Sequence, residues 1–235
     1  MNLRSIVLSL ILISSVKSID PYSNGPHDVQ EKTYYRILTN GLDHTLVAWV
    51  PNTSGSFPIV YFNPGVGGMV PGWFYSMMAK HLASHGFVVL SPFALITTPI
   101  FEYKAEWLVQ VDQWAQSNLL DKLLQDGLNP GLQLDFENTF LMGHSSGNHI
   151  SINYLKLGCH NVKGVVLISP VDGVDPFGFI DDYCITPGEK LPFDTPTLVI
   201  STGLDAVPGN TIKSEASEGP KGRSSKAFLI FVLPF

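Results

Sequence analysis

The chain has 235 residues, 45% of them hydrophobic and 14% charged, and its formal net charge is −6. This low charged fraction, combined with abundant apolar residues, excludes disorder over most of the chain, and the length suits one domain with a sizeable core. The acidic balance, without any long basic cluster, excludes nucleic acid as a partner.

Residues 1–18 have the pattern of an export signal. Arg4 supplies an early positive charge, an apolar run follows over residues 6–13, and small residues stand three and one positions before Ile19. The apolar run is far shorter than the ~20 residues that a membrane-spanning helix needs. We therefore expect a signal peptide over residues 1–18 and a secreted mature chain without an integral membrane segment.

Secretion affects how two other features are interpreted. Cys159 and Cys184 are the only cysteines, and in an oxidising compartment they can form a disulfide, the alternative being two buried free thiols. Asn52 begins the only N-glycosylation sequon, in a turn rich in Pro, Gly and Ser that we expect to be exposed.

After a polar leader at residues 19–33, the chain alternates strand and helix patterns. Residues 34–38 and 45–50 predict two strands joined by a turn at Asn40 and Gly41. Apolar runs predict buried strands, and helical spacing predicts helices: strands at 57–62, 87–92, 138–142, 165–169 and 197–201, and helices at 73–85, 104–125 and 146–157. This alternation indicates a single α/β domain at residues 34–208, with a mostly parallel sheet, helices on both faces and an N-terminal antiparallel hairpin.

The candidate chemistry lies where the predicted strand 138–142 meets the predicted helix 146–157. Gly143, Ser145 and Gly147 form the pattern G-x-S-x-G. Between a buried strand and a helix, the two glycines let the backbone turn sharply enough to expose the Ser145 hydroxyl. This context favours a nucleophilic serine over a chance serine in a glycine-rich turn.

A nucleophilic serine needs donors for the oxyanion, a general base and a carboxylate that orients the base. The backbone N–H of Ser146, the residue after the nucleophile, is one expected donor. The other is expected from the loop 65–68, which follows the predicted strand 57–62, and we assign it to Val66. A plain turn is the alternative for that loop.

Two carboxylates compete for the role of the acid. Asp205 follows the predicted strand 197–201, and Asp172 follows the predicted strand 165–169, one strand nearer to the nucleophile. Placement at a strand end favours Asp205 over Asp172 without deciding between them, and either can be a turn or capping residue.

The base has no convincing candidate among the seven histidines. In the order serine, acid, histidine, the base should follow the acid, but the last histidine is His160. His144 adjoins the nucleophile, and His149 lies one helical turn beyond it. We expect packing or solvent exposure for His81 and His85.

The C-terminal residues depart from the alternating pattern. Residues 213–226 are polar and rich in Ser and Gly, and residues 228–235 form an apolar octapeptide for which no partner strand is expected. We interpret residues 209–235 as an atypical tail. The hypothesis is that truncation, alternative splicing or a frame shift has replaced the segment that holds the base, which would leave this chain inactive.

These segments together resemble the α/β-hydrolase superfamily, and more narrowly the chlorophyllases with the neighbouring polyester hydrolases and cutinase-like lipases. The resemblance is carried by Tyr75-Ser76 and by residues 81–89, 143–147, 170–173 and 196–205. It implies an α/β-hydrolase fold and a serine carboxylic-ester hydrolase that works through an acyl-enzyme, without a metal or organic cofactor. Chlorophyllases typically have G-H-S-R-G-G, whereas here Ser146 and Asn148 replace the arginine and the last glycine.

Apolar residues near the loop 65–68 suit a small, hydrophobic ester as the substrate: Met69, Trp73 and Phe74. Two interpretations compete with an active esterase. One is a relative that keeps the fold but only binds a lipid or a partner protein, and the other is a truncated product that misfolds. The identity of the ester and the oligomeric state stay open.

Overall fold

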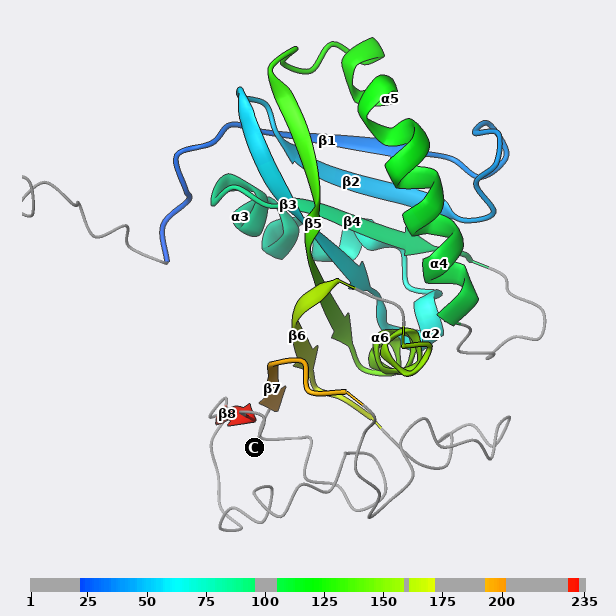
Figure 1. Cartoon of the computed structure of the whole chain (residues 1–235), viewed down its shortest axis with the longest axis vertical. Helices are drawn as coiled ribbons and strands as arrows, with labels where there is room; N and C mark the ends of the chain where they lie inside the picture. The colour runs from blue at the N-terminus through cyan, green and yellow to red at the C-terminus, as the bar shows by residue number, and fades with distance from the viewer. Residues whose placement is uncertain (1–21, 96–104, 159–160, 172–192, 202–227, 233–235) are drawn as a thin grey trace, which may run out of the picture.

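The computed structural model describes residues 22–95, 105–158, 161–171, 193–201 and 228–232. Its centre is an eight-stranded sheet with the strand order β1-β2-β4-β3-β5-β6-β7-β8 (Figure 1). The strands are β1 (Val29–Tyr34), β2 (Thr45–Pro51), β3 (Gly55–Asn63), β4 (Val88–Phe93), β5 (Leu132–His144), β6 (Val162–Ile168), β7 (Thr197–Ser201) and β8 (Phe228–Val232).

The sheet has a parallel centre and antiparallel edges. Strands β4, β3, β5, β6 and β7 pair in parallel, whereas β1 with β2, β2 with β4 and β7 with β8 pair antiparallel. Parallel neighbours need long crossovers. These contain α3 (Ser76–Ser84) between β3 and β4, α4 (Ala105–Trp114) and α5 (Leu120–Gln125) between β4 and β5, and α6 (Gly147–Lys156) between β5 and β6.

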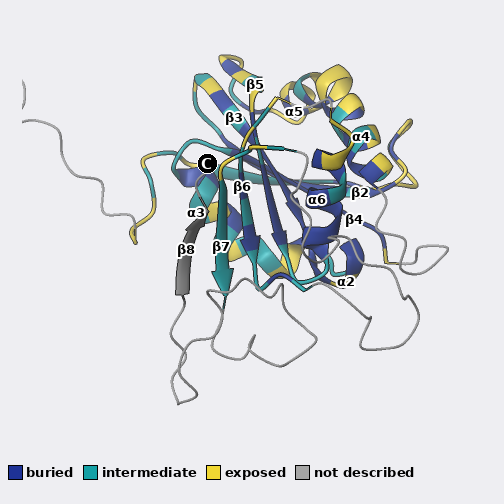
Figure 2. Cartoon of the chain, turned by 60° about the horizontal axis from the view of Figure 1, so that its bottom comes forward, coloured by how far each residue is buried: buried dark blue, intermediate teal, exposed yellow. Residues whose placement is uncertain are grey.

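Two hydrophobic cores lie on opposite faces of the sheet. Side chains alternate along β3, so that Tyr61 enters one core and Val60 the other. The Tyr61 core includes Leu108 of α4, while the Val60 core includes Ala79 and Ala83 of α3. Figure 2 shows the buried residues concentrated in the central strands and in the inner faces of these helices. The predicted mostly parallel sheet with helices on both faces is confirmed.

The individual elements agree closely with the sequence pattern. Each predicted apolar run falls on a strand to within one residue at its ends, and β5 is longer than predicted, with 13 residues. The predicted helix 104–125 is α4 and α5, joined by a π-helical turn at Ala115–Leu119. The predicted helix 73–85 is a 3₁₀ turn at Gly72–Tyr75 that continues into α3 and ends at Gly86, where φ is 94°.

The prediction of a first strand at residues 34–38 is wrong. Strand β1 lies in the preceding segment and pairs from Tyr34↔Leu46 to Val29↔Pro51. Residues 36–38 form a turn in which Ile37 is 88% exposed. An edge strand needs no continuous apolar run, because polar side chains can find partners on its open face. Glu31 of β1 accepts a hydrogen bond from Trp49 Nε1 and pairs with Lys80 at 2.9 Å.

The expectation that the apolar C-terminal residues have no partner strand is also wrong. Residues 228–232 form β8, which pairs with β7 from Thr197↔Val232 to Ser201↔Phe228. Strand β8 therefore occupies the edge that β7 would otherwise leave open, and it satisfies backbone groups there. Over the described residues, no helix is long and apolar enough to cross a membrane.

Candidate active site

Ser145 occupies a sharp turn between β5 and α6. Its φ is 53°, in the left-handed region that residues other than glycine rarely adopt. The turn is anchored by the Ser145 N–H, which donates to the Ile168 carbonyl at the end of β6 (3.0 Å). A strained serine at the carboxyl end of a central parallel strand, directly before a helix, is the geometry of a nucleophile elbow.

The two glycines of the motif are required because the turn leaves no room for side chains. A Cβ at Gly143 would lie 2.5 Å from Asn148 Oδ1 and 3.0 Å from the Asn148 backbone. A Cβ at Gly147 would overlap the carbonyl oxygens of Asn63 and Pro64 at the end of β3. Helix α6 therefore begins in direct contact with the neighbouring strand, which places Ser145 beside the loop that follows β3.

Asn148 reinforces the turn through its side-chain amide. Its Nδ2 donates to the Ser145 carbonyl (2.8 Å) and to the Ile168 carbonyl (3.0 Å). Its backbone N–H donates to the Ser145 carbonyl as well, at 3.2 Å. Asn148, one of the two residues that depart from the G-H-S-R-G-G pattern, thus ties the elbow to β6.

The loop after β3 has an unusual backbone. Val66 and Gly67 are both left-handed, with φ values of 54° and 58°. Strands β3 and β5 are parallel neighbours in which Asn63 is paired with Gly143, so this loop and the elbow leave the sheet side by side. The predicted loop 65–68 is thus a tight turn, α2 (Gly65–Gly68), whose left-handed residues depart from a regular helix.

Most backbone N–H groups of this loop donate to defined acceptors. Gly65 N–H donates to the Tyr75 hydroxyl (3.2 Å), and Gly67 N–H donates to Ser146 Oγ (2.8 Å). Gly68 N–H donates to the Pro64 carbonyl. Among the described residues, the N–H groups of Val66 and Ser146 have no acceptor. These are the two predicted oxyanion donors.

Tyr75 connects the loop to the residue before the nucleophile. Its hydroxyl lies 2.9 Å from His144 Nδ1 while it accepts the Gly65 N–H. Burial raises the pKa of the Tyr75 hydroxyl, and the Gly65 hydrogen bond offsets part of that rise. The hydroxyl therefore keeps its proton, which it can donate to His144 Nδ1.

Four of the described histidines make hydrogen bonds to groups other than Ser145. The ring of His144 bonds to Tyr75, and His149 Nε2 lies 2.6 Å from the Val171 carbonyl. His27 bonds to the Thr53 hydroxyl and His85 to the Ser23 carbonyl. None of these arrangements is that of a base on the Ser145 hydroxyl.

Both candidate acids and both cysteines lie outside the described residues: Asp172, Asp205, Cys159 and Cys184. The strands that precede the acids run parallel to β5, and they end at the same edge as the elbow. His149 of α6 reaches the carbonyl of Val171, the residue directly before Asp172. The choice between Asp172 and Asp205 remains a prediction.

The sequon lies between β2 and β3. Asn52 is half-buried, and its Oδ1 accepts the Asn129 N–H (2.9 Å), whereas Ser54 is exposed. Glycosylation of Asn52 remains a prediction.

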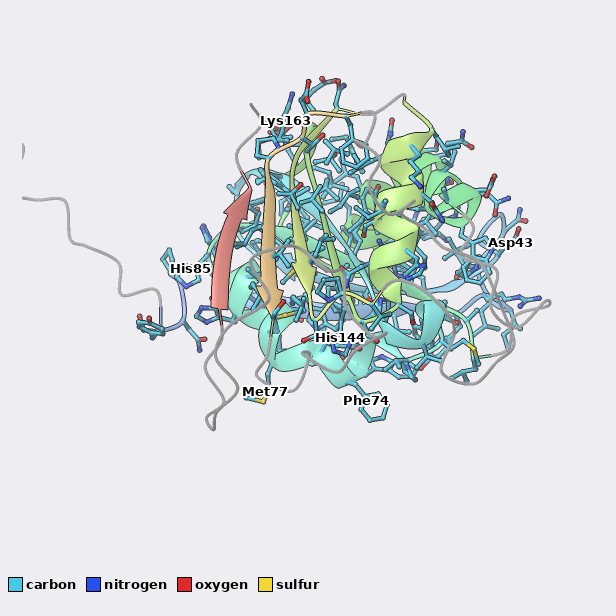
Figure 3. The ribbon with its side chains drawn as sticks, turned by 90° about the horizontal axis from the view of Figure 1, so that it is seen from below. Asp43, Phe74, Met77, His85, His144 and Lys163 are labelled. Atoms are coloured by element: carbon cyan, nitrogen blue, oxygen red, sulfur yellow. The ribbon has the colours of Figure 1, made fainter. Side chains whose placement is uncertain are left out.

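Exposed apolar side chains occur in the loop that follows β3 and in the residues after it in the sequence. Phe74 is 79% exposed and Met77 is 91% exposed, and Val66 and Trp73 are partly exposed. Figure 3 shows Phe74 and Met77 pointing outward on the same side of the molecule as His144. Within the described residues, no group of three or more His, Cys, Asp or Glu side chains is placed to hold a metal ion.

Sequence reasoning missed the roles of Tyr75 and Asn148 and of the Ser146 side chain. Tyr75 belongs to the segment that carries the resemblance, but nothing in the pattern says that its hydroxyl meets Gly65. Ser146 and Asn148 differ from the typical chlorophyllase residues, and those two departures were the available signal.

The strand order, the parallel crossovers and the elbow between β5 and α6 define an α/β-hydrolase fold. Residues 17–230 match the sequence pattern of the chlorophyllase family, and the chain belongs to that family.

Relatives of known name agree with this assignment. The chain is 25% identical to Chlorophyllase-1 of Arabidopsis thaliana over 162 residues, which cover 66% of this chain and 48% of that protein. It is 32% identical to Chlorophyllase type 0 of Chenopodium album over 170 residues, covering 68% and 48% respectively. The chain thus spans about half the length of the relatives it matches.

Two esterases are among the solved structures to which the chain is similar. Esterase B from Lactobacillus rhamnosis, inhibited by a tributyrin phosphonate, is 16% identical with a TM-score of 0.45, over 74% of this chain and 60% of that one. A thermostable esterase from Pseudomonas putida is 14% identical with a TM-score of 0.46, over 74% and 52%.

Proposed function

We propose that this chain is a serine carboxylic-ester hydrolase in which Ser145 is the nucleophile. The observation that carries the proposal is the left-handed Ser145, held at the end of β5 beside a loop whose Val66 N–H has no acceptor among the described residues. Membership of the chlorophyllase family supports ester cleavage as the reaction class.

In the proposed reaction, Ser145 Oγ attacks the ester carbonyl and passes its proton to a base. The N–H groups of Val66 and Ser146 stabilise the oxyanion, and Asp205 or Asp172 orients the base. The alcohol leaves with a proton from the base. Water then attacks the acyl-enzyme and releases the carboxylic acid.

The proposed substrate is a hydrophobic ester. Phe74 and Met77 are large apolar side chains exposed on the same side of the molecule as His144, and their exposure is unfavourable unless they meet an apolar group of the ligand. We also propose that the protein is secreted, on the pattern of residues 1–18, and Edman sequencing of the secreted chain from Ile19 would support this.

Labelling with a fluorophosphonate tests the nucleophile. The reagent should modify the wild-type chain at Ser145, with loss of fluoride, and Ser145→Ala should abolish the labelling. The matched control is Ser117→Ala, because Ser117 is an exposed helix residue whose hydroxyl bonds to the Gln113 carbonyl of its own helix. Labelling that persists in Ser145→Ala would refute the proposal.

A second candidate function is ester binding without turnover. It is favoured by His144 and His149, the histidines nearest to Ser145 in the sequence, which bond to the Tyr75 hydroxyl and the Val171 carbonyl. Assays with p-nitrophenyl esters of increasing acyl length separate the two candidates. Turnover that disappears in Ser145→Ala supports the hydrolase, whereas saturable binding without product release supports the binding protein.

A further inference from the structure

We propose that the side chains of Ser146 and Tyr75 are positioning groups that hold the loop after β3 so that the Val66 N–H faces the oxyanion. This inference rests on the proposed function, since it concerns the loop that would supply one oxyanion donor. It gives the Ser146 hydroxyl a role separate from that of its backbone N–H.

The first observation is that Ser146 does not cap its own helix. Ser146 is the N-cap residue of α6, where a serine hydroxyl normally accepts an N–H from the first turn of the helix. Here no such capping bond forms. Instead, Ser146 Oγ accepts the N–H of Gly67, which lies 79 positions away in the sequence, at 2.8 Å. The hydroxyl is thus used for a contact between the elbow and the loop.

The second observation is that the other side of Val66 is held in a similar way. Gly65 N–H donates to the Tyr75 hydroxyl, and that hydroxyl lies 2.9 Å from His144 Nδ1. The N–H groups on both sides of Val66 therefore end on side-chain hydroxyls. Both hydroxyls are tied to the nucleophile, one through Ser146 itself and the other through His144.

The third observation concerns Val66. A β-branched residue is disfavoured at a φ of 54°, so its surroundings must hold it there. With Gly65 and Gly67 engaged, the Val66 N–H is left without an acceptor among the described residues. A preorganised donor stabilises an oxyanion because it needs no rearrangement during the reaction. The two hydroxyls provide this preorganisation.

The experiment compares Ser146→Ala, Ser146→Thr and Tyr75→Phe with the wild-type chain. One readout is amide hydrogen exchange at Gly65 and Gly67, measured by NMR. The other is the rate of Ser145 labelling by a fluorophosphonate. Ser117→Ala serves as the control whose exchange and labelling stay unchanged.

We expect Ser146→Ala to speed exchange at Gly67 and to slow labelling about tenfold, a fraction of the loss that follows removal of an oxyanion donor itself. Ser146→Thr keeps the hydroxyl, so its exchange at Gly67 and its labelling rate should stay close to those of the wild type. Tyr75→Phe should speed exchange at Gly65. Where esters are turned over, kcat should fall while KM changes little.

Unchanged exchange at Gly67 in Ser146→Ala would overturn the inference, and so would faster exchange combined with wild-type labelling. A wild-type chain that is not labelled refutes the proposed function instead. In that case, the exchange rates still decide whether the hydroxyls hold the loop, so the two failures are distinguishable.

Discussion

The two turns at the active edge of the sheet reach the same backbone conformation by different means. The turn after β5 holds Ser145 at a φ of 53°, and the turn after β3 holds Val66 at 54°. They leave neighbouring parallel strands in register. The elbow is fixed mainly by close main-chain contact, because a Cβ at Gly147 would overlap the backbone at the end of β3, and the Asn148 side chain adds hydrogen bonds to it. The loop after β3 is fixed by side-chain hydroxyls.

This difference affects what each turn tolerates. A turn set by close main-chain contacts cannot accommodate an added atom. Adding one also disturbs the packing of α6 against β3. A turn set by two hydrogen bonds can loosen while the fold stays intact. The elbow should therefore respond to substitution mainly in stability, and the loop mainly in activity.

The largest expected effect is that of Gly147→Ala. The added methyl group would overlap the Asn63 and Pro64 carbonyls, which belong to the backbone and cannot move aside without shifting β3 or α6. We expect a loss of about 3 kcal/mol or more in the free energy of unfolding, measured by urea denaturation.

The matched control is Gly158→Ala, beyond the other end of α6. Gly158 has a φ of 77°, and nothing lies within 4 Å of the position that an added methyl group would take, so only backbone strain of about 1 kcal/mol is expected there. Equal losses in the two variants would show that contact with β3 does not set the elbow.

Gly65→Ala tests the loop in the same way and should have a smaller effect on the fold. The new Cβ would lie 3.1 Å from His144 Nδ1, 3.4 Å from the Tyr75 hydroxyl and 3.6 Å from Ser145 Cβ. Side chains can yield by a few tenths of an ångström, so we expect a stability close to wild type. Because the Tyr75–His144 pair is displaced, labelling of Ser145 should slow about tenfold, or about 1.4 kcal/mol in activation free energy.

Gly127→Ala is the control for Gly65→Ala. Gly127 has a φ of 84° with nothing within 4 Å, so its substitution should lower stability through strain without slowing the labelling. If Gly65→Ala lost stability and kept wild-type labelling, the loop would be fixed by close packing, like the elbow, and not by side-chain hydroxyls.

The elbow could be predicted from sequence because the residues that determine it are adjacent in the chain. Two glycines around a serine, between an apolar run and a helical pattern, leave few alternatives for the backbone. The parallel sheet and its crossovers were predictable for the same reason, since burial on both faces selects apolar runs.

The loop and the edges were not predictable because their causes lie far away in the sequence. Nothing local indicates that Ser146 accepts a bond from Gly67 or that Tyr75 reaches Gly65. The polar strand β1 depends on partners from β2 and α3, and β8 depends on the edge of β7. These pairings become visible only when the chain is folded.

The smallest expected effect is a pH dependence of protein stability caused by His44, which lies near the loop after β3. His44 is 6% exposed, and its ring lies 4.5 Å from the ring of Trp107. Trp107 in turn approaches Gly68, the last residue of the loop. Burial lowers the pKa of His44 to about 4, although the nearby Asp43 opposes the shift. His44 Nδ1 has no hydrogen-bond partner among the described residues, so the folded state favours the neutral ring.

Acid should therefore lower the free energy of unfolding, because His44 binds a proton more readily in the unfolded chain. The unfolded chain binds the proton near pH 6.5 and the folded chain only near pH 4, so this contribution is complete above pH 6.5 and is lost as the pH falls toward 4. Between pH 7.5 and 5.5 we expect a loss of about 1 kcal/mol in urea unfolding followed by tryptophan fluorescence. His44→Phe keeps a ring against Trp107 but cannot titrate, so it should show a loss smaller by that amount. Equal losses in the two proteins would mean that other groups cause the acid sensitivity. The packing of His44 and Trp107 near Gly68 would then be independent of pH.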